Sequence, residues 1–236
     1  MKFIFYSHSD YSDIWDVLFG QCDEYLKNQS KVLFTDMVGK GNVPKDWDVV
    51  YYDEKLPYQE RVTSCLAQLE DEIVVFSHED MIPCNDIDFK TLKEFEELIR
   101  DDSVDFIKLL RAGYTDNHLQ SKEHAYLVDC PPDMVFTIQP TICKKDRLMT
   151  MYSETPGSSI WEFEAQTLHT AAHHEFAGRM AYRSTDKKRG MYHYDSSTYP
   201  YIATAIVKGK WYTSDYPEIK DLLKSYKIDI TERGEA

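Results

Sequence analysis

The chain has 236 residues, and its 27 Lys and Arg against 41 Asp and Glu give a formal net charge of −14. This charge argues against a general DNA- or RNA-binding surface, because nonspecific affinity for nucleic acid comes largely from Lys and Arg that neutralise phosphates. Although 42% of the residues are hydrophobic, no apolar run approaches the ~18 residues of a membrane span and no signal-peptide core follows Met1, so we expect a cytoplasmic protein without a membrane span.

The first half of the chain alternates predicted strands with predicted helices. Apolar or β-branched runs bounded by turn residues predict strands at 3–6, 31–35, 48–52, 73–76 and 104–110. Apolar residues at helical spacing predict helices at 14–27, 58–69 and 89–100. The run at 73–76 is apolar throughout, which is typical of a strand buried on both faces. This alternation indicates an α/β fold with a mainly parallel sheet.

The second half has shorter and more irregular signals. A polar loop is expected at 115–123, a strand at 134–138, a short helix at 146–152, a hairpin at 201–213 and a helix within 216–230. Ser159 lies three residues before Glu162, an arrangement that predicts a capping box and a helix start. We find no composition shift sharp enough to mark a linker, so we expect one domain.

The most informative polar cluster follows the strand at 73–76. Ser77, His78, Glu79 and Asp80 come directly after it. Ligands of open α/β sheets bind beyond the carboxyl ends of the strands, and adjacent carboxylates there suit a hard divalent cation. The polar groups of Ser7–Asp10 and of Asp53 and Glu54 would lie on the same edge if the sheet is parallel. The alternative is an ordinary polar loop, which any buried strand must reach.

Four longer segments carry a resemblance to a known family. LEDEIVVFSHEDMIP at 69–83 follows the arginine-containing helix YQERVTSCLAQLE, and this order resembles the nucleotide-binding half of GT-A glycosyltransferases, viral and bacterial builders of surface polysaccharides among them. FTIQPTICKKDRLMTM and SSIWEFEAQ look like the acceptor-side half of the same group. The resemblance spans most of residues 1–175. It implies a GT-A-like, Rossmann-like fold with a nucleotide-sugar-binding half at 1–113 and a smaller, mixed acceptor-side half at 114–236.

The resemblance also implies a donor site. The family's Asp-x-Asp is replaced here by His78-Glu79-Asp80, in which Asp80 occupies the final acidic position. Asp80, with Glu79 or His78 and a further ligand in His173, would hold Mn²⁺ or Mg²⁺ on a nucleotide-diphosphate sugar. The residues expected to bind the nucleotide or its diphosphate are Ser7, His8, Asp10, Arg61, Lys187, Lys188 and Arg189.

An acceptor site is expected on the helix that begins after Ser159. If the transfer inverts the sugar carbon, a carboxylate must take the proton of the acceptor hydroxyl. Glu162 and Glu164 are the candidates, and because they are two apart on a helix they do not share a face. Glu164 is favoured because it shares a face with Trp161, whose ring could stack on a sugar. Both glutamates could instead be exposed helix charges.

Two other functions fit parts of the sequence. His169 and His173 are four residues apart, so on a helix they could converge on one zinc ion of a metal-dependent hydrolase. The metalloprotease motif is incomplete, because Thr170 follows the first histidine where a glutamate is needed. The third possibility is a noncatalytic module that binds a sugar or nucleotide. The sequence therefore favours a glycosyltransferase that acts on a glycan or another hydroxyl acceptor.

Overall fold

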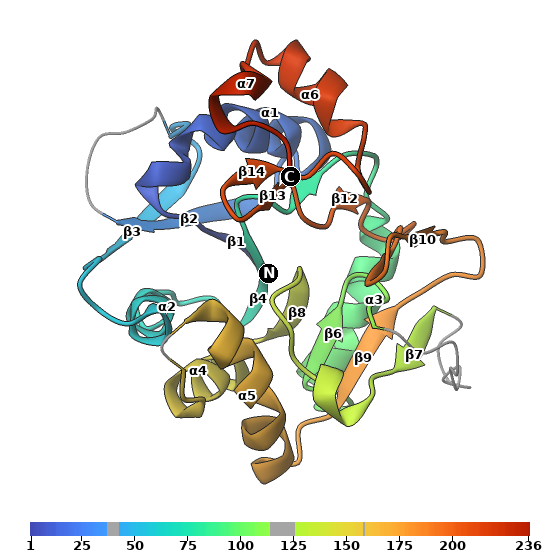
Figure 1. Cartoon of the computed structure of the whole chain (residues 1–236). Coiled ribbons are helices and arrows are strands. Elements are labelled where there is room, and N and C mark those ends of the chain that lie inside the picture. The colour runs from blue at the N-terminus through green and yellow to red at the C-terminus, as the bar shows by residue number, and fades with distance from the viewer. Residues whose placement is uncertain (37–42, 114–125, 158) are drawn as a thin grey trace.

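One mixed sheet runs through the middle of the protein in the computed structural model (Figure 1). The structure describes residues 1–36, 43–113, 126–157 and 159–236. Within these residues, eight strands form the sheet in the spatial order β3-β2-β1-β4-β8-β6-β9-β7. In chain order they are β1 (Lys2–Tyr6), β2 (Ser30–Asp36), β3 (Asp48–Tyr52), β4 (Ile73–His78), β6 (Phe106–Lys108), β7 (Leu127–Asp129), β8 (Thr141–Lys144) and β9 (Gly178–Ala181).

Helices cover both faces of this sheet. The α-helices are α1 (Trp15–Tyr25), α2 (Tyr58–Leu66), α3 (Phe89–Arg100), α4 (Lys145–Glu154), α5 (Ile160–His173), α6 (Ile219–Ser225) and α7 (Ile230–Arg233). Two short 3-10 helices are η1 (Ser9–Ile14) and η2 (Pro132–Met134). In Figure 1, α1, α6 and α7 lie above β1 and β2, while α2, α4 and α5 lie below them. None of the described helices is long and apolar enough to cross a membrane.

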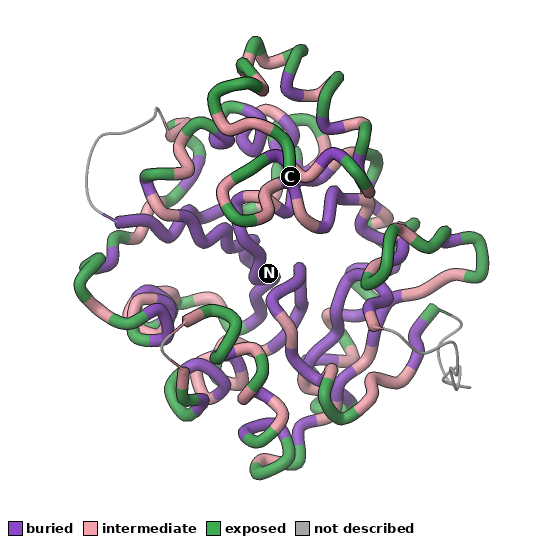
Figure 2. The backbone as a smooth tube through the Cα atoms, in the orientation of Figure 1, coloured by how far each residue is buried: buried purple, intermediate pink, exposed green. Residues whose placement is uncertain are grey.

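The parallel part of the sheet forms the core, as the apolar runs predict. β1 pairs in parallel with β2 and β4, and β2 pairs in parallel with β3. Every residue of β1 and β4 is buried, which Figure 2 shows as a continuous purple band through the centre. Strands that are apolar on both faces need cover on both sides, and the two helical layers provide it. The predicted α/β class is therefore confirmed.

The predicted strand at 134–138 is wrong. Its first residue ends η2, and no strand includes the segment. The side chain of Phe136 is nevertheless buried, with its ring packed against those of Phe106 and Phe163. The apolar pattern of this segment therefore indicates that it is buried, but not that it pairs as a strand. The neighbouring strand of the sheet is β8, which lies antiparallel between β4 and β6.

The last third of the chain contributes short strands and two helices. Small antiparallel pairs join β5 (Ile82–Pro83) to β12 (Tyr201–Ile202), β10 (Lys188–Arg189) to β11 (His193–Tyr194), and β13 (Ile206–Val207) to β14 (Lys210–Trp211). The last pair confirms the predicted hairpin turn around Gly209, but the hairpin is shorter than predicted, because Tyr201 and Ile202 pair with β5 instead. The helix predicted within 216–230 is α6, and the loop predicted at 115–123 lies outside the described residues. Ser159 caps α5 by accepting a hydrogen bond from the Glu162 amide at 3.2 Å, as predicted.

Candidate functional site

The carboxyl ends of four strands meet along one edge of the sheet. Tyr6 of β1 lies opposite Phe34 of β2 and His78 of β4, and Asp36 of β2 lies opposite Tyr52 of β3. The polar segments that end or follow these strands are thereby brought together, as the sequence predicts for a parallel sheet. This edge is where open α/β sheets bind their ligands.

Asp36 is the fixed anion of this edge. Its carboxylate is buried, and the amide and the hydroxyl of Ser9 donate hydrogen bonds to its two oxygens, both at 2.6 Å. Burial by itself raises the pKa of Asp36, but the Ser9 hydrogen bonds and the nearby His8 outweigh it, so the pKa is lowered. Asp36 is thus held as a carboxylate with its position set by the segment after β1.

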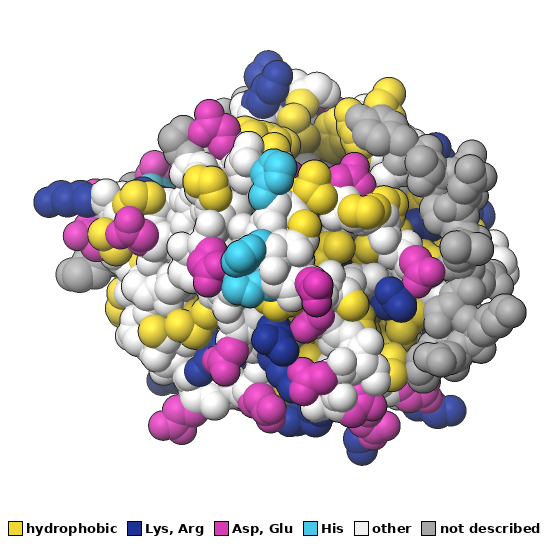
Figure 3. Space-filling model, turned by 90° about the horizontal axis from the view of Figure 1, so that it is seen from below, with side chains coloured by type: hydrophobic (Ala, Val, Ile, Leu, Met, Phe, Trp, Pro, Cys, Tyr) yellow, Lys and Arg dark blue, Asp and Glu magenta, His cyan; other side chains and the backbone are white. Residues whose placement is uncertain are grey.

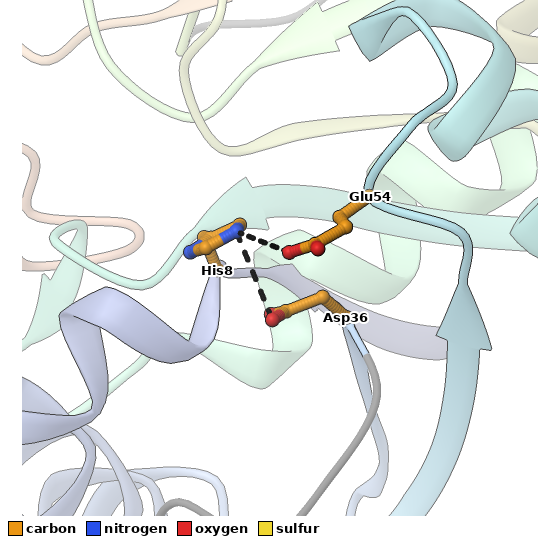
Figure 4. Close-up of side chains that lie close together, drawn as sticks. All are labelled: His8, Asp36 and Glu54. Carbon is orange, nitrogen blue, oxygen red and sulfur yellow. Dashed lines mark ion pairs between the residues drawn. The ribbon is translucent and has the colours of Figure 1, made fainter.

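His8 and Glu54 complete a cluster with Asp36 (Figure 4). The Nε2 atom of His8 lies 3.7 Å from a carboxylate oxygen of Asp36 and 3.7 Å from one of Glu54. Among the described residues this is the one group of three with metal-compatible spacing. However, Nδ1 of His8 accepts a hydrogen bond from the Asp10 amide at 3.1 Å, whereas a metal-binding histidine donates its other ring N–H. In the tautomer that keeps this bond, Nε2 of His8 carries a proton, which suits a hydrogen-bond donor better than a metal ligand.

Two further predicted residues of this edge, Ser7 and Arg61, have internal partners. Ser7 is fully buried, and its hydroxyl accepts a hydrogen bond from the Trp15 indole at 2.7 Å. The Arg61 guanidinium lies over the Tyr52 ring, 5.4 Å from its centroid, and donates to the carbonyls of Leu56 and Glu54. The structure thus brings Arg61 to the edge of the sheet. Ser7 lies buried beneath this edge, where its hydroxyl contacts the Trp15 indole.

His78 does not join the acidic residues that follow it. Its Nε2 atom lies 2.8 Å from the Tyr58 hydroxyl, and its ring packs among those of Tyr6 and Phe76. Burial lowers the pKa of His78 to about 3, so the ring is neutral. The interpretation of His78 as a metal ligand is therefore replaced by a place in the aromatic core, because its strand alternation points it away from solvent.

Glu79, which is buried, and Asp80, which is half-buried, form an acidic pair beside the end of β1. The Glu79 amide donates to the Tyr6 carbonyl at 3.1 Å, and the Asp80 carboxylate accepts from the Ile206 amide at 3.4 Å. Burial and the neighbouring Asp80 raise the pKa of Glu79, and burial raises that of Asp80 to about 6. Two carboxylates this close repel one another in a site shielded from water. A divalent cation would relieve that repulsion, and carboxylate oxygens are the ligands that Mg²⁺ and Mn²⁺ prefer.

The first turn of α5 lies against the start of α2. The Gln59 side chain donates to the Gly157 carbonyl at 2.6 Å, and the Tyr58 and Phe163 rings are 5.7 Å apart. Trp161 is 75% exposed in this first turn. Glu164 is half-buried and accepts a hydrogen bond from the Ile138 amide at 2.8 Å.

The basic segment at 187–189 lies elsewhere. Lys187 and Arg189 line a cavity of about 1050 Å³ together with Tyr25, the last residue of α1. Because α1 begins at Trp15, beside Ser7, and has 11 residues, Tyr25 is about 16 Å along the helix from the strand ends. Arg189 also pairs with Asp195 at 2.7 Å and with Glu218 at 2.9 Å. The structure does not bring this segment, Lys188 included, to the edge.

His173 is also remote from the acidic pair. It is exposed at the last residue of α5, a helix of 14 residues, so it lies about 20 Å along the helix from the first turn. Figure 3 shows histidine side chains among acidic and basic ones on the face below α4 and α5. His169 and His173 belong to no metal-compatible group of three among the described residues. The zinc hydrolase therefore gains no support from the geometry.

Comparisons with known proteins give a fold but no family. No protein-family model and no curated protein matches the sequence. The CMP:2-keto-3-deoxy-manno-octonic acid synthetase complexed with CTP aligns over 95% of this chain and 98% of its own, with a TM-score of 0.52 and 9% identity. TarS residues 1–349 of S. aureus align over 98% and 67%, with a TM-score of 0.46 and 13% identity. The bifunctional IspDF of Campylobacter jejuni aligns over 84% and 52%, with a TM-score of 0.45 and 12% identity.

The likeness to the synthetase shows the fold alone. This chain has a mixed α/β fold like that of the synthetase, with a mostly parallel sheet flanked by helices. The residues of this chain must therefore carry any statement about its reaction.

Proposed function

We propose that the protein transfers a sugar from a nucleotide-diphosphate sugar to a hydroxyl group of a glycan acceptor. The observation that carries this proposal is the edge itself, where the fixed carboxylate of Asp36 ends β2 and the acidic pair Glu79 and Asp80 follows β4, the two parallel strands that flank β1. Two points support it: the synthetase that shares this fold is complexed with CTP, and open α/β sheets bind their ligands beyond the carboxyl ends of the strands.

The nucleoside is held by acceptors in this proposal. Asp36 accepts hydrogen bonds from ribose hydroxyls or from base N–H groups, as the acidic residue of dinucleotide-binding sheets does. His8 donates from Nε2, and the exposed Glu54 adds a second acceptor at the rim. Arg61, at the start of α2, supplies positive charge on this side. Asp10 lies beside His8, with its carboxylate 3.5 Å from the ring.

The acidic pair is assigned to the diphosphate. Asp80 and Glu79 would hold Mn²⁺ or Mg²⁺, which supplies Lewis-acid stabilisation of the negative charge on the leaving nucleoside diphosphate. The Ile206 amide orients the Asp80 carboxylate for this role. Burial of the pair excludes water, which strengthens electrostatic interactions in the site.

The acceptor is assigned to the first turns of α5. Glu164 is the proposed base, because its hydrogen bond with the Ile138 amide fixes one carboxylate oxygen and leaves the other available for the acceptor hydroxyl. Glu162 is exposed in the first turn of α5 and is the second candidate. The indole of Trp161 offers an exposed apolar face for a sugar ring.

Nucleotidyl transfer is the second candidate, because the aligned synthetase spans nearly the whole chain. A nucleoside triphosphate carries more negative charge than a diphosphate sugar, and glycine-rich loops or cations bind such groups. The segment after β1, residues 7–14, reads SHSDYSDI and has no Gly, Lys or Arg. Glycosyl transfer therefore fits this edge better.

The experiment is a thermal-shift screen of UDP- and GDP-sugars with and without Mn²⁺, followed by an assay of nucleoside diphosphate release. We expect one nucleotide sugar to stabilise the protein in the presence of Mn²⁺, and Asp80→Asn to abolish the Mn²⁺-dependent part and to lower turnover about 100-fold. Asp86→Asn, an exposed carboxylate beside the remote cavity, is the matched control. Pyrophosphate release from CTP and a sugar acid, without turnover of any nucleotide sugar, would establish the nucleotidyl reaction instead.

A further inference from the structure

The last residues of the chain are held beside the β13–β14 hairpin. The Trp211 amide donates to the Gly234 carbonyl at 3.0 Å, and the Ala236 amide donates to the Trp211 carbonyl at 2.9 Å. The Thr213 hydroxyl also donates to the Glu235 carboxylate. These bonds fix the position of α7, which ends at Arg233. Figure 1 shows α7 close to the hairpin and above the sheet.

Arg233 thereby reaches the segment that follows β1. Two nitrogens of its guanidinium pair with the two carboxylate oxygens of Asp13 in η1, and one also donates to the Asp10 carbonyl at 3.4 Å. The guanidinium lies over the Tyr11 and Trp211 rings, 4.9 and 5.6 Å from their centroids. Its side chain is 15% exposed, so part of the guanidinium group's surroundings is open to solvent.

The same hairpin also holds the acidic pair. Residues 205 and 206 donate their amides to the backbone carbonyl and the side chain of Asp80. Glu79 lies beside the end of β1, just before the segment that Arg233 contacts. The charges of Arg233 and Asp13 both act on the carboxyl group of Glu79. The C-terminal segment and the acidic pair therefore face one region of the carboxyl edge.

We propose that Arg233 binds the diphosphate of the donor nucleotide, and that Asp13 occupies its guanidinium until the nucleotide arrives. This inference rests on the proposed function and adds a residue from the far end of the chain. The two-pronged pairing of Arg233 with Asp13 uses the geometry that a guanidinium also offers to a phosphate. A carboxylate at that place can therefore be exchanged for a phosphate without a change in the arginine's geometry.

The charge of the edge requires such a cation. Asp10, Asp13, Asp36, Glu54, Glu79 and Asp80 all lie along it. Arg61 donates to two carbonyl groups and lies over the Tyr52 ring, on the side of β3. Arg233 approaches from the side of η1 and the hairpin, where it also donates to the Gly209 carbonyl at 3.3 Å. A guanidinium at this place would stabilise the charge that develops on the leaving diphosphate.

The test is calorimetric titration of the intact protein with a nucleoside diphosphate and with the matching nucleoside, the base being that of the nucleotide sugar that stabilises the protein most. Arg233→Gln should weaken diphosphate binding 10-fold or more, as a rough expectation for a lost charge-assisted pair, and leave nucleoside binding unchanged. Arg233→Lys should recover part of the loss. Asp13→Asn should tighten diphosphate binding several-fold, because the competing carboxylate is gone.

The control is Arg100→Gln, which removes a surface arginine paired with Glu96 and Glu72 at the end of α3. Equal diphosphate affinity of Arg233→Gln and the wild type overturns the inference. An equal loss for the nucleoside and the diphosphate also overturns it, because that result marks a structural role. If the wild type binds no nucleotide, the proposed function itself fails. If Arg233→Gln does not fold, the Asp13→Asn variant tests the proposal instead. Weaker diphosphate binding by Asp13→Asn contradicts the exchange of the Asp13 carboxylate for a phosphate on Arg233.

Discussion

The two halves of the molecule build the candidate site in different ways. In residues 1–113, polar groups reach the edge because they end parallel strands, and the register of β1, β2, β3 and β4 sets their positions. In residues 126–236, the contributions come from single contacts, such as the Ile206 amide, the first turn of α5 and the Arg233 guanidinium. The first half supplies mainly carboxylates, and the second supplies donors, a cation and an exposed aromatic ring.

This difference predicts where affinity for the nucleotide resides. If the strand ends hold the nucleoside, Asp36→Asn should weaken nucleotide binding about 100-fold, since hydrogen bonds to charged groups contribute ~1.5–3 kcal/mol each. The asparagine would also turn its amino group toward a Ser9 donor, because both oxygens of Asp36 accept from that residue. Calorimetric titration with the nucleotide measures the loss.

Glu54→Gln is the matched control for Asp36. Its carboxylate belongs to the same cluster, but its side chain is 62% exposed. Solvent screens an exposed charge, so we expect a change of only a few-fold. Equal losses in the two variants would mean that the fixed carboxylate of Asp36 has no special part in binding.

The first half was largely predictable from local patterns. The strand at 48–52 and the helix at 89–100 have the predicted bounds, and the acidic motif follows a buried strand as expected. Asp36 was missed because the sequence marks it only as a turn residue after the apolar run at 31–35. In the structure it is the last residue of β2, paired in register with Tyr52. The rule that selects polar residues at strand ends would have found it with a strand one residue longer.

The second half depends on contacts that no local pattern encodes. Arg233 meets Asp13 across 220 positions of the chain. The length of α5 decides that His173 lies far from its first turn, and the path of the chain after β9 takes Lys187 to the remote cavity. The segment at 134–138 has the composition of a strand, yet Phe136 fills the core from a loop. The apolar composition of this segment predicts its burial, but not its secondary structure.

Stability at low pH gives a second comparison of the two halves, since each contains a histidine whose pKa is lowered: His78 is buried and His193 is half-buried. Burial lowers the pKa of His78 to about 3 and that of His193 to about 4, with Asp215 acting against the shift of His193. An unfolded histidine has a pKa of ~6.5, so the unfolded state takes up protons first as the pH falls below that value. Stability should therefore decline from pH 6.5 toward pH 4. We expect His193 to contribute about 2 kcal/mol of that decline at pH 4.5.

Urea unfolding of the wild type and His193→Gln at pH 7 and pH 4.5 measures this contribution. The glutamine can keep a polar contact with Gln139, which lies 3.3 Å from the His193 ring, but it does not titrate. The variant should lose less stability than the wild type between the two pH values. The decline with falling pH that remains is expected to come from His78. Parallel pH profiles would show that His193 is protonated in the folded protein as readily as in the unfolded one.

The smallest expected effect concerns the acceptor. Trp161 is 75% exposed, so Trp161→Ala should leave the free energy of unfolding within about 0.5 kcal/mol of the wild type. If its indole stacks on the acceptor sugar, the lost contact of ~1 kcal/mol should raise KM for the acceptor about five-fold and leave donor affinity unchanged. Tyr51→Ala, which removes a 55% exposed ring from β3, is the control. Recovery by Trp161→Phe would assign the effect to stacking, whereas a change in donor affinity would place Trp161 on the nucleotide side of the site.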